Sequence, residues 1–144
     1  MINEQELYKL AKGYVGIPHV NGGNVRAGLD CCTLPAHLIK DITGREIKIK
    51  FGYSGDWYLK RKHEEILLPY LLEYFEKVDE LQAGDLISYR WGRSNYAHLS
   101  MYIKPNVVIH CSADNGVEMA EMTNYYFFDG KGESRITGFW RLKQ

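Results

Sequence analysis

The sequence predicts an α+β fold in which N-terminal helices pack on a central antiparallel sheet of about five strands. Three observations predict this fold. Helical periodicity dominates the first half of the chain, a period of two begins near Gly84, and hairpin-length connections join the strand-like segments. Helices followed by strands are typical of α+β folds, in which the two kinds of element segregate. Residues 1–144 are expected to form a single domain.

Three segments before the sheet have the apolar spacing of amphipathic helices. They are residues 3–13, 31–43 and 64–77. In the second segment, Asp30 is suited to cap the N-terminus and Gly44 to end the helix. Pro69 in the third segment implies a kink or a later start, because a proline inside a helix removes a backbone hydrogen bond.

Five later segments alternate between apolar and polar residues and are predicted to be strands. They cover residues 85–89, 97–103, 106–112, 117–122 and 135–142. The turn near Lys104 and Pro105 indicates that the second and third of these strands form a hairpin. The aromatic run at 125–128 is expected to be core, given the area that each ring must bury, with an exposed contact surface as the alternative.

The composition argues against several kinds of function. Lys and Arg together number 18, as do Asp and Glu, so no net charge favours nucleic acid or an anionic membrane surface. The short basic clusters at 48–50 and 60–62 are interpreted as solvated surface. No segment has the ~18 apolar residues that a membrane-spanning helix needs. The N-terminus lacks a basic stretch followed by an apolar run, so we expect no signal peptide and a protein that is cytoplasmic as synthesised.

The three cysteines point to a free thiol. They are an odd number, and Cys31 is adjacent to Cys32, so a disulfide framework is not expected. Cys31 directly follows Asp30, where the dipole and free N–H groups of a helix N-terminus would lower the pKa of a thiol and could hold an oxyanion. Cys32 is rotated by about 100° and is interpreted as a buried hydrophobe. Buried packing is the alternative interpretation for Cys31 itself.

Two histidines are candidates for the base that a thiol nucleophile needs. Alternation places His98 and His110 on the faces of their strands that lie opposite the apolar residues, and a hairpin would bring them nearly opposite each other. One could then take the thiol proton while the other holds its ring and tautomer. The alternatives are two incidental strand histidines, or a zinc site with a cysteine, for which no recognised ligand spacing is present. We expect no metal and no cofactor.

The order of these residues resembles the NlpC-type family of cell-wall peptidases, which are papain-like cysteine peptidases. The first motif of that family is a Gly-rich loop ending in Gly-x-Asp-Cys, here residues 16–31. The second joins a Gly-Asp-Leu strand, here 81–87, to a His at the start of another strand, here His98. The third is a polar residue on the following strand, here His110. The resemblance spans residues 7–112 and implies a papain-like fold.

The resemblance also implies roles and a substrate. Cys31 would attack an amide bond of a peptidoglycan stem peptide and form a thioester acyl-enzyme, with His98 as base and then acid and His110 orienting His98. His19 and Asp30 are expected to contact the substrate. His19 stands where members of the family often have a Tyr, and a neutral imidazole donates one hydrogen bond as a phenol does, so His19 could donate to an oxyanion. The alternative is an ordinary loop histidine.

The short form with Gly-Ile-Pro in its first loop resembles versions encoded by phages and prophages. This resemblance implies phage tail proteins as partners and a protein that is virion-associated or released. Two alternative functions stay open. One is a thiol acyltransferase or deamidase that uses the same three residues, and the other is a non-catalytic tail-associated module that retains them.

Overall fold

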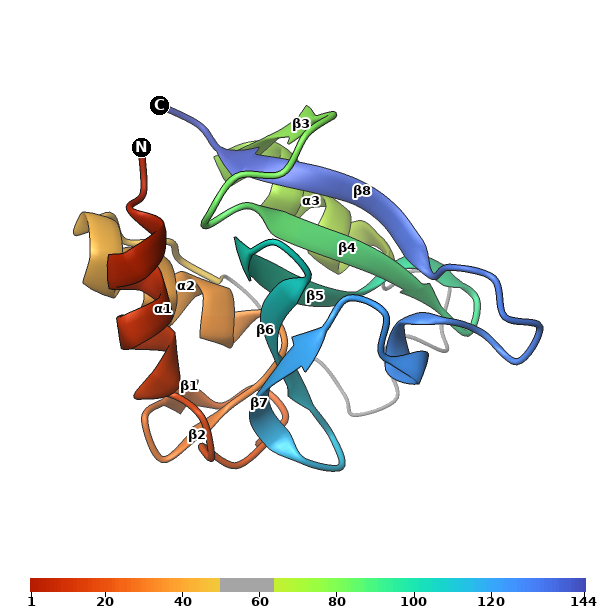
Figure 1. Ribbon diagram of the computed structural model, residues 1–144. Coiled ribbons are helices and arrows are strands. Elements are labelled where there is room, and N and C mark those ends of the chain that lie inside the picture. The colour runs from red at the N-terminus through yellow and green to blue at the C-terminus, as the bar shows by residue number, and fades with distance from the viewer. Residues whose placement is uncertain (50–63) are drawn as a thin grey trace.

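The computed structural model describes residues 1–49 and 64–144, and Figure 1 shows their arrangement. The elements are α1 (Glu4–Lys12), β1 (Asn24–Val25), β2 (Gly28–Leu29), α2 (Thr33–Thr43), α3 (Glu64–Tyr74), β3 (Phe75–Val78), β4 (Leu86–Trp91), β5 (Ser94–Lys104), β6 (Val107–Ser112), β7 (Gly116–Glu121), the 3₁₀ helix η3 (Tyr125–Phe127) and β8 (Ile136–Leu142). Among the described residues, no helix is long and apolar enough to cross a membrane. The predicted basic surface at Lys50 and 60–62 lies outside the described residues.

The main sheet has six antiparallel strands in the order β3–β8–β4–β5–β6–β7, where about five were expected. The additional strand is β3. The third helix ends at Tyr74 instead of continuing to residue 77, and Phe75 pairs with Leu142 of β8. Apolar spacing did not reveal this change, because Phe75 packs into the core from the strand just as it would from a helix.

The three helices share one core with one face of the sheet. Each of them contacts β5, and this core contains the following side chains of β5 and β6: Leu99, Met101, Ile103, Ile109 and Cys111. These are the residues that alternation assigns to the apolar face. The other face of the sheet is covered by a second, smaller cluster that includes Tyr89, Val108 and Phe127. The face that carries the two histidines is therefore buried too.

The register of the β5–β6 hairpin differs from the expected one. His110 pairs with Ser100, and His98 lies two residues before Ser100 in β5. The two histidines are therefore diagonal neighbours and not directly opposite. A register shift between Tyr102 and Lys104 sets this offset, and Asn106 takes a φ of 64° in the turn. Alternation from the sequence gives the shared face but not such a shift.

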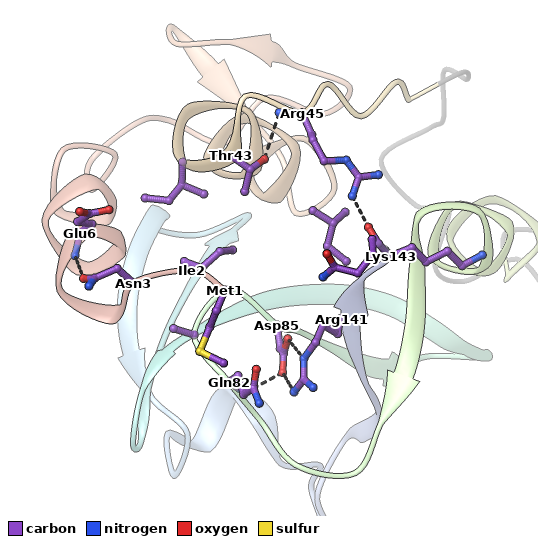
Figure 2. Close-up of a pocket in the computed structure, with 15 residues that line it drawn as sticks. Met1, Ile2, Asn3, Glu6, Thr43, Arg45, Gln82, Asp85, Arg141 and Lys143 are labelled. Carbon is purple, nitrogen blue, oxygen red and sulfur yellow. Dashed lines mark hydrogen bonds and ion pairs between the residues drawn. The ribbon is translucent and has the colours of Figure 1, made fainter.

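The Gly-Asp-Leu motif at the start of β4 holds an ion pair. Arg141 of β8 donates through Nε and Nη2 to the two carboxylate oxygens of Asp85 at 3.0 and 2.7 Å, as Figure 2 shows. The backbone N–H of Gln82 donates to Asp85 Oδ2 at 2.7 Å. Gly84 has a φ of 92°, and a Cβ there would lie 2.4 Å from Ile2 Cδ1. The motif thus positions the strand that precedes His98.

Replacing Arg141 with alanine should destabilise the protein. The substitution leaves the buried Asp85 carboxylate without its charged partner. Because the Arg141 side chain is 30% exposed, water can enter the space it leaves and replace some of the lost hydrogen bonds. We expect the free energy of unfolding, measured with urea, to fall by about 1–2 kcal/mol. Arg93→Ala, at an exposed arginine between β4 and β5, is the control and should change it by less than about 0.5 kcal/mol. Equal losses in both variants would contradict the assignment.

Candidate active site

Cys31 lies in the turn that precedes α2, not within the helix. The helix begins at Thr33 with Cys32 as its N-cap, so the predicted start at residue 31 is two residues early. Asp30 explains the difference. Its Oδ1 accepts hydrogen bonds from the backbone N–H groups of Cys32 and Thr33 at 2.9 and 3.0 Å, and its Oδ2 accepts one from Gly22 N–H at 2.9 Å. This buried carboxylate satisfies helix N–H groups and ties the glycine-rich loop to them.

These hydrogen bonds change the expectation for the oxyanion. The N–H groups of Cys32 and Thr33 donate to Asp30, so they are not free donors as the sequence suggested. Asp30 does not belong to the residues that line the pocket beside Cys31. Its contacts give it a structural role, and substrate binding by Asp30 stays a prediction.

Cys31 and His98 line the same pocket, which has a volume of about 260 Å³. The other lining residues are His19, Asn21, Trp91, Ala97, Cys111, Ala113, Asp114 and Tyr126. Cys31 is 8% exposed whereas Cys32 is 0% exposed, so the adjacent cysteines differ as the helix geometry suggested. The structure thus brings together the proposed nucleophile, the proposed base and His19.

The other two thiols are poor nucleophile candidates. Cys32 is fully buried, with its Sγ 3.9 Å from that of Cys31. Cys111 donates through Sγ to the carbonyl oxygen of Leu29 at 3.3 Å. Burial, with smaller contributions from nearby Cys31 and Asp30, raises the pKa of Cys111 to about 12. This thiol therefore stays protonated near neutral pH.

The two histidines form part of a hydrogen-bonded chain. His98 Nε2 lies 2.8 Å from His110 Nδ1, and His110 Nε2 lies 3.1 Å from Glu118 Oε2. Sequence reasoning did not identify Glu118, which pairs directly with His110 between β6 and β7. The sequence signal was ambiguous, because a two-residue Asn115-Gly116 turn would pair Glu118 with Ala113 on the other face. The observed turn has three residues, 113–115, pairs Ser112 with Gly116 and so places Glu118 beside His110.

Both imidazoles are neutral near pH 7. Burial, with the nearby His110 and His19, lowers the pKa of His98 well below its usual value of 6.5. Burial also lowers the pKa of His110, although the Glu118 carboxylate opposes this shift. A neutral imidazole has one N–H donor and one lone pair. His98 is therefore in the form that can accept a proton from a thiol.

Aromatic side chains of η3 cover the histidines. The ring centroid of Tyr126 lies 5.3 Å from that of His98 and 5.0 Å from that of His110. Phe127 stacks on Tyr89 at 4.9 Å and is 2% exposed. The aromatic run was expected to be core, which is confirmed for Phe127 but wrong for Tyr125, whose exposed fraction is 86%. In a single turn of 3₁₀ helix the three side chains diverge, so they cannot all face the sheet.

A larger cavity of about 700 Å³ lies near the two chain ends, where Figure 2 shows the Asp85–Arg141 pair. Its lining contains no His and no Cys, so it offers no thiol and imidazole pair. Within residues 1–49 and 64–144, no group of three or more His, Cys, Asp or Glu side chains is placed to hold a metal ion. His98 Nε2 and His110 Nδ1 face each other, which argues against the zinc alternative.

A model of the NlpC/P60 family matches residues 16–131. A probable endopeptidase of Haemophilus influenzae is 26% identical over 145 residues, covering 100% of this chain and 73% of that protein. The probable peptidoglycan endopeptidase LytE of Bacillus subtilis is 24% identical over 129 residues, covering 88% of this chain and 32% of that relative. The chain thus spans about a third of LytE.

Solved structures show the same fold. The NlpC/p60 domain of the peptidoglycan hydrolase SagA is 19% identical with a TM-score of 0.61, covering 99% of this chain and 100% of that one. An NlpC/P60 family protein from Bacillus cereus is 24% identical with a TM-score of 0.68, covering 96% of this chain and 40% of that one. The predicted papain-like α+β fold is therefore confirmed.

Iodoacetamide should alkylate Cys31 before the other two thiols. Cys31 lines the pocket and is the most exposed of the three thiols, and Cys32 is fully buried. Cys111 also lines the pocket, but it is only 1% exposed and is held protonated. Brief treatment of the folded protein near neutral pH, followed by mass spectrometry of its peptides, measures the order. Cys31→Ser should lose the rapid labelling and Cys32→Ser should keep it. Rapid labelling of Cys111 would contradict the assignment.

The two histidines should make the protein less stable in mild acid. Their pKa values are lowered in the folded state, so the unfolded chain takes up more protons as the pH falls through the usual value of 6.5. The free energy of unfolding should therefore fall between about pH 7.5 and about pH 5.5. Urea unfolding at both pH values measures it. His110→Asn, which does not titrate there, should reduce the difference, and an unchanged difference would refute this origin.

Proposed function

This chain belongs to the NlpC/P60 family, and from that premise we propose that it is a cysteine peptidase that cleaves an amide bond in peptidoglycan stem peptides. The observation that supports this best is the pocket shared by Cys31 and His98, with His98 hydrogen-bonded to His110. A thiol nucleophile, a base and a group that orients the base are what acyl transfer through a thioester needs. Two relatives named as probable endopeptidases, one of them for peptidoglycan, support a wall peptide as substrate.

The first half of the reaction forms the thioester. His98 accepts the thiol proton of Cys31 through Nδ1, because Nε2 is engaged with His110. The sulfur attacks the carbonyl carbon of the substrate, and the carbon–nitrogen bond breaks as His98 returns the proton to the leaving amine.

In the second half, water hydrolyses the thioester. His98 takes a proton from the water as its oxygen attacks the acyl carbon, and the carbon–sulfur bond breaks. The proton returns to the Cys31 sulfur, and the other half of the substrate leaves with a new carboxyl group.

His19 is our candidate for stabilising the oxyanion of both tetrahedral intermediates. It lines the pocket together with Cys31, and an imidazole ring carries an N–H donor. The backbone N–H of Cys31 itself would supply the second hydrogen bond. A preorganised donor aimed at the oxyanion contributes most where the pocket excludes water.

The biological setting stays a prediction from the first loop. In that prediction the chain is a phage or prophage version, has phage tail proteins as partners, and is virion-associated or released. A thiol acyltransferase or deamidase would share every step up to the thioester and differ in the group that attacks it. A non-catalytic tail module would retain the residues without turnover.

Cys31→Ala should abolish the cleavage of purified muropeptides, and His98→Ala should lower kcat by about 10²- to 10⁴-fold because the base is lost. Mass spectrometry of the products measures turnover and gives the bond that is cut. Cys32→Ala is the matched control, since it removes the adjacent thiol that does not line the pocket, and it should keep its activity.

Three outcomes would contradict this proposal. Turnover retained by Cys31→Ala would exclude Cys31 as the nucleophile. A thioester on Cys31 without cleavage of muropeptides would favour the acyltransferase or deamidase. The absence of both turnover and rapid labelling of Cys31 would favour the non-catalytic module.

A further inference from the structure

Glu118 ends the hydrogen-bonded chain that begins at the pocket, and we propose that it is a positioning residue that decides which nitrogen of His98 serves as the base. It would act through His110 and not through contact with the substrate. This inference rests on the proposed function, because it concerns the same site. It adds a fourth residue to the three that the sequence suggested.

The position of Glu118 is fixed by the sheet and by the turn before it. Glu118 pairs with His110 in the β6–β7 register, and its Oε2 lies 3.1 Å from His110 Nε2. Ser112 Oγ donates to the same oxygen at 3.4 Å and accepts the backbone N–H of Asn115 at 3.1 Å. The Glu118 side chain is 33% exposed, whereas His110 is buried, so the hydrogen-bonded chain of side chains runs from the interior towards solvent.

The carboxylate fixes the direction of every hydrogen bond in this chain. An ionised carboxylate only accepts, so His110 must place its proton on Nε2. A neutral imidazole has one N–H, so His110 Nδ1 is then an acceptor, and the 2.8 Å contact requires His98 to donate from Nε2. The lone pair of His98 is therefore on Nδ1, the nitrogen that must take the proton of Cys31.

Without the carboxylate, the hydrogen bonds between the two histidines could run in the opposite direction. His110 would donate from Nδ1 to His98 Nε2, and His98 would have its proton on Nδ1, where it could not accept another. The two directions use the same pair of neutral rings and differ little by themselves. A hydrogen bond to a charged group decides between them, and its strength corresponds to a preference of about 10- to 100-fold.

Glu118→Gln is the variant that tests this role, since the amide keeps the size of the side chain and can donate to His110 Nε2. We expect kcat to fall by about two- to tenfold, because the amide can accept as well as donate and no longer enforces the competent direction. KM should be nearly unchanged, because substrate contacts are left in place. The melting temperature should stay close to that of the unchanged protein. Glu121→Gln, the same substitution on the same strand, is the matched control and should keep its activity.

The protonated nitrogen can be observed directly. Correlation spectra of ¹⁵N-labelled histidine side chains, recorded in the Cys31→Ala background, should show His98 and His110 protonated at Nε2. In Glu118→Gln, the protons should move wholly or partly to Nδ1 of both rings, whereas Glu121→Gln should leave them in place. This measurement needs no substrate, so it distinguishes failure of this inference from failure of the proposed function.

Unchanged tautomers in Glu118→Gln would overturn the inference, whatever the activity. Lost activity together with a large fall in melting temperature and unchanged tautomers would make Glu118 merely structural. Protons on Nδ1 of both rings in the protein with Glu118 intact would also overturn it. A tautomer change without cleavage of muropeptides by the unmodified protein would support the positioning role and remove the peptidase proposal.

Discussion

The register of β6 between β5 and β7 determines the candidate site. It places His110 beside Glu118 on one side and diagonal to His98 on the other, all on one face of the sheet. A slip of one residue would turn these side chains to the other face, because side chains alternate along a strand. The hydrophobic alternation that buries Met101 and Ile109 therefore also places the polar chain.

Burial of this polar chain explains its chemistry. Two imidazoles inside a protein would be unfavourable without partners, and here each ring makes a hydrogen bond to the next group. The aromatic side chains of η3 exclude water from them, which keeps both rings neutral. Because this cover disfavours an imidazolium in the resting protein, His98 keeps the lone pair with which it can accept a proton.

Much of this arrangement could be predicted from local patterns. Period and spacing gave the helices, five of the six strands of the main sheet and the shared face of His98 and His110. The later start of α2 could not be predicted, because it depends on which N–H groups the Asp30 carboxylate binds. The diagonal offset depends on a register shift, and the cover over His98 comes from η3, nearly thirty residues further along the chain. These features arise from tertiary contacts that alternation does not encode.

The loop that leads to Cys31 and the strands that carry the histidines are distant in the sequence, yet backbone hydrogen bonds hold them together. The loop that leads to Cys31 pairs with β7, since Gly16 N–H donates to Val117 O and Val117 N–H donates to Ile17 O, both at 2.9 Å. Gly116 permits this approach, because a Cβ there would lie 2.5 Å from Ile17 O. Val117 directly precedes Glu118. The strand that anchors the nucleophile loop therefore also presents the carboxylate at the end of the histidine chain, so a shift of β7 would move both halves together.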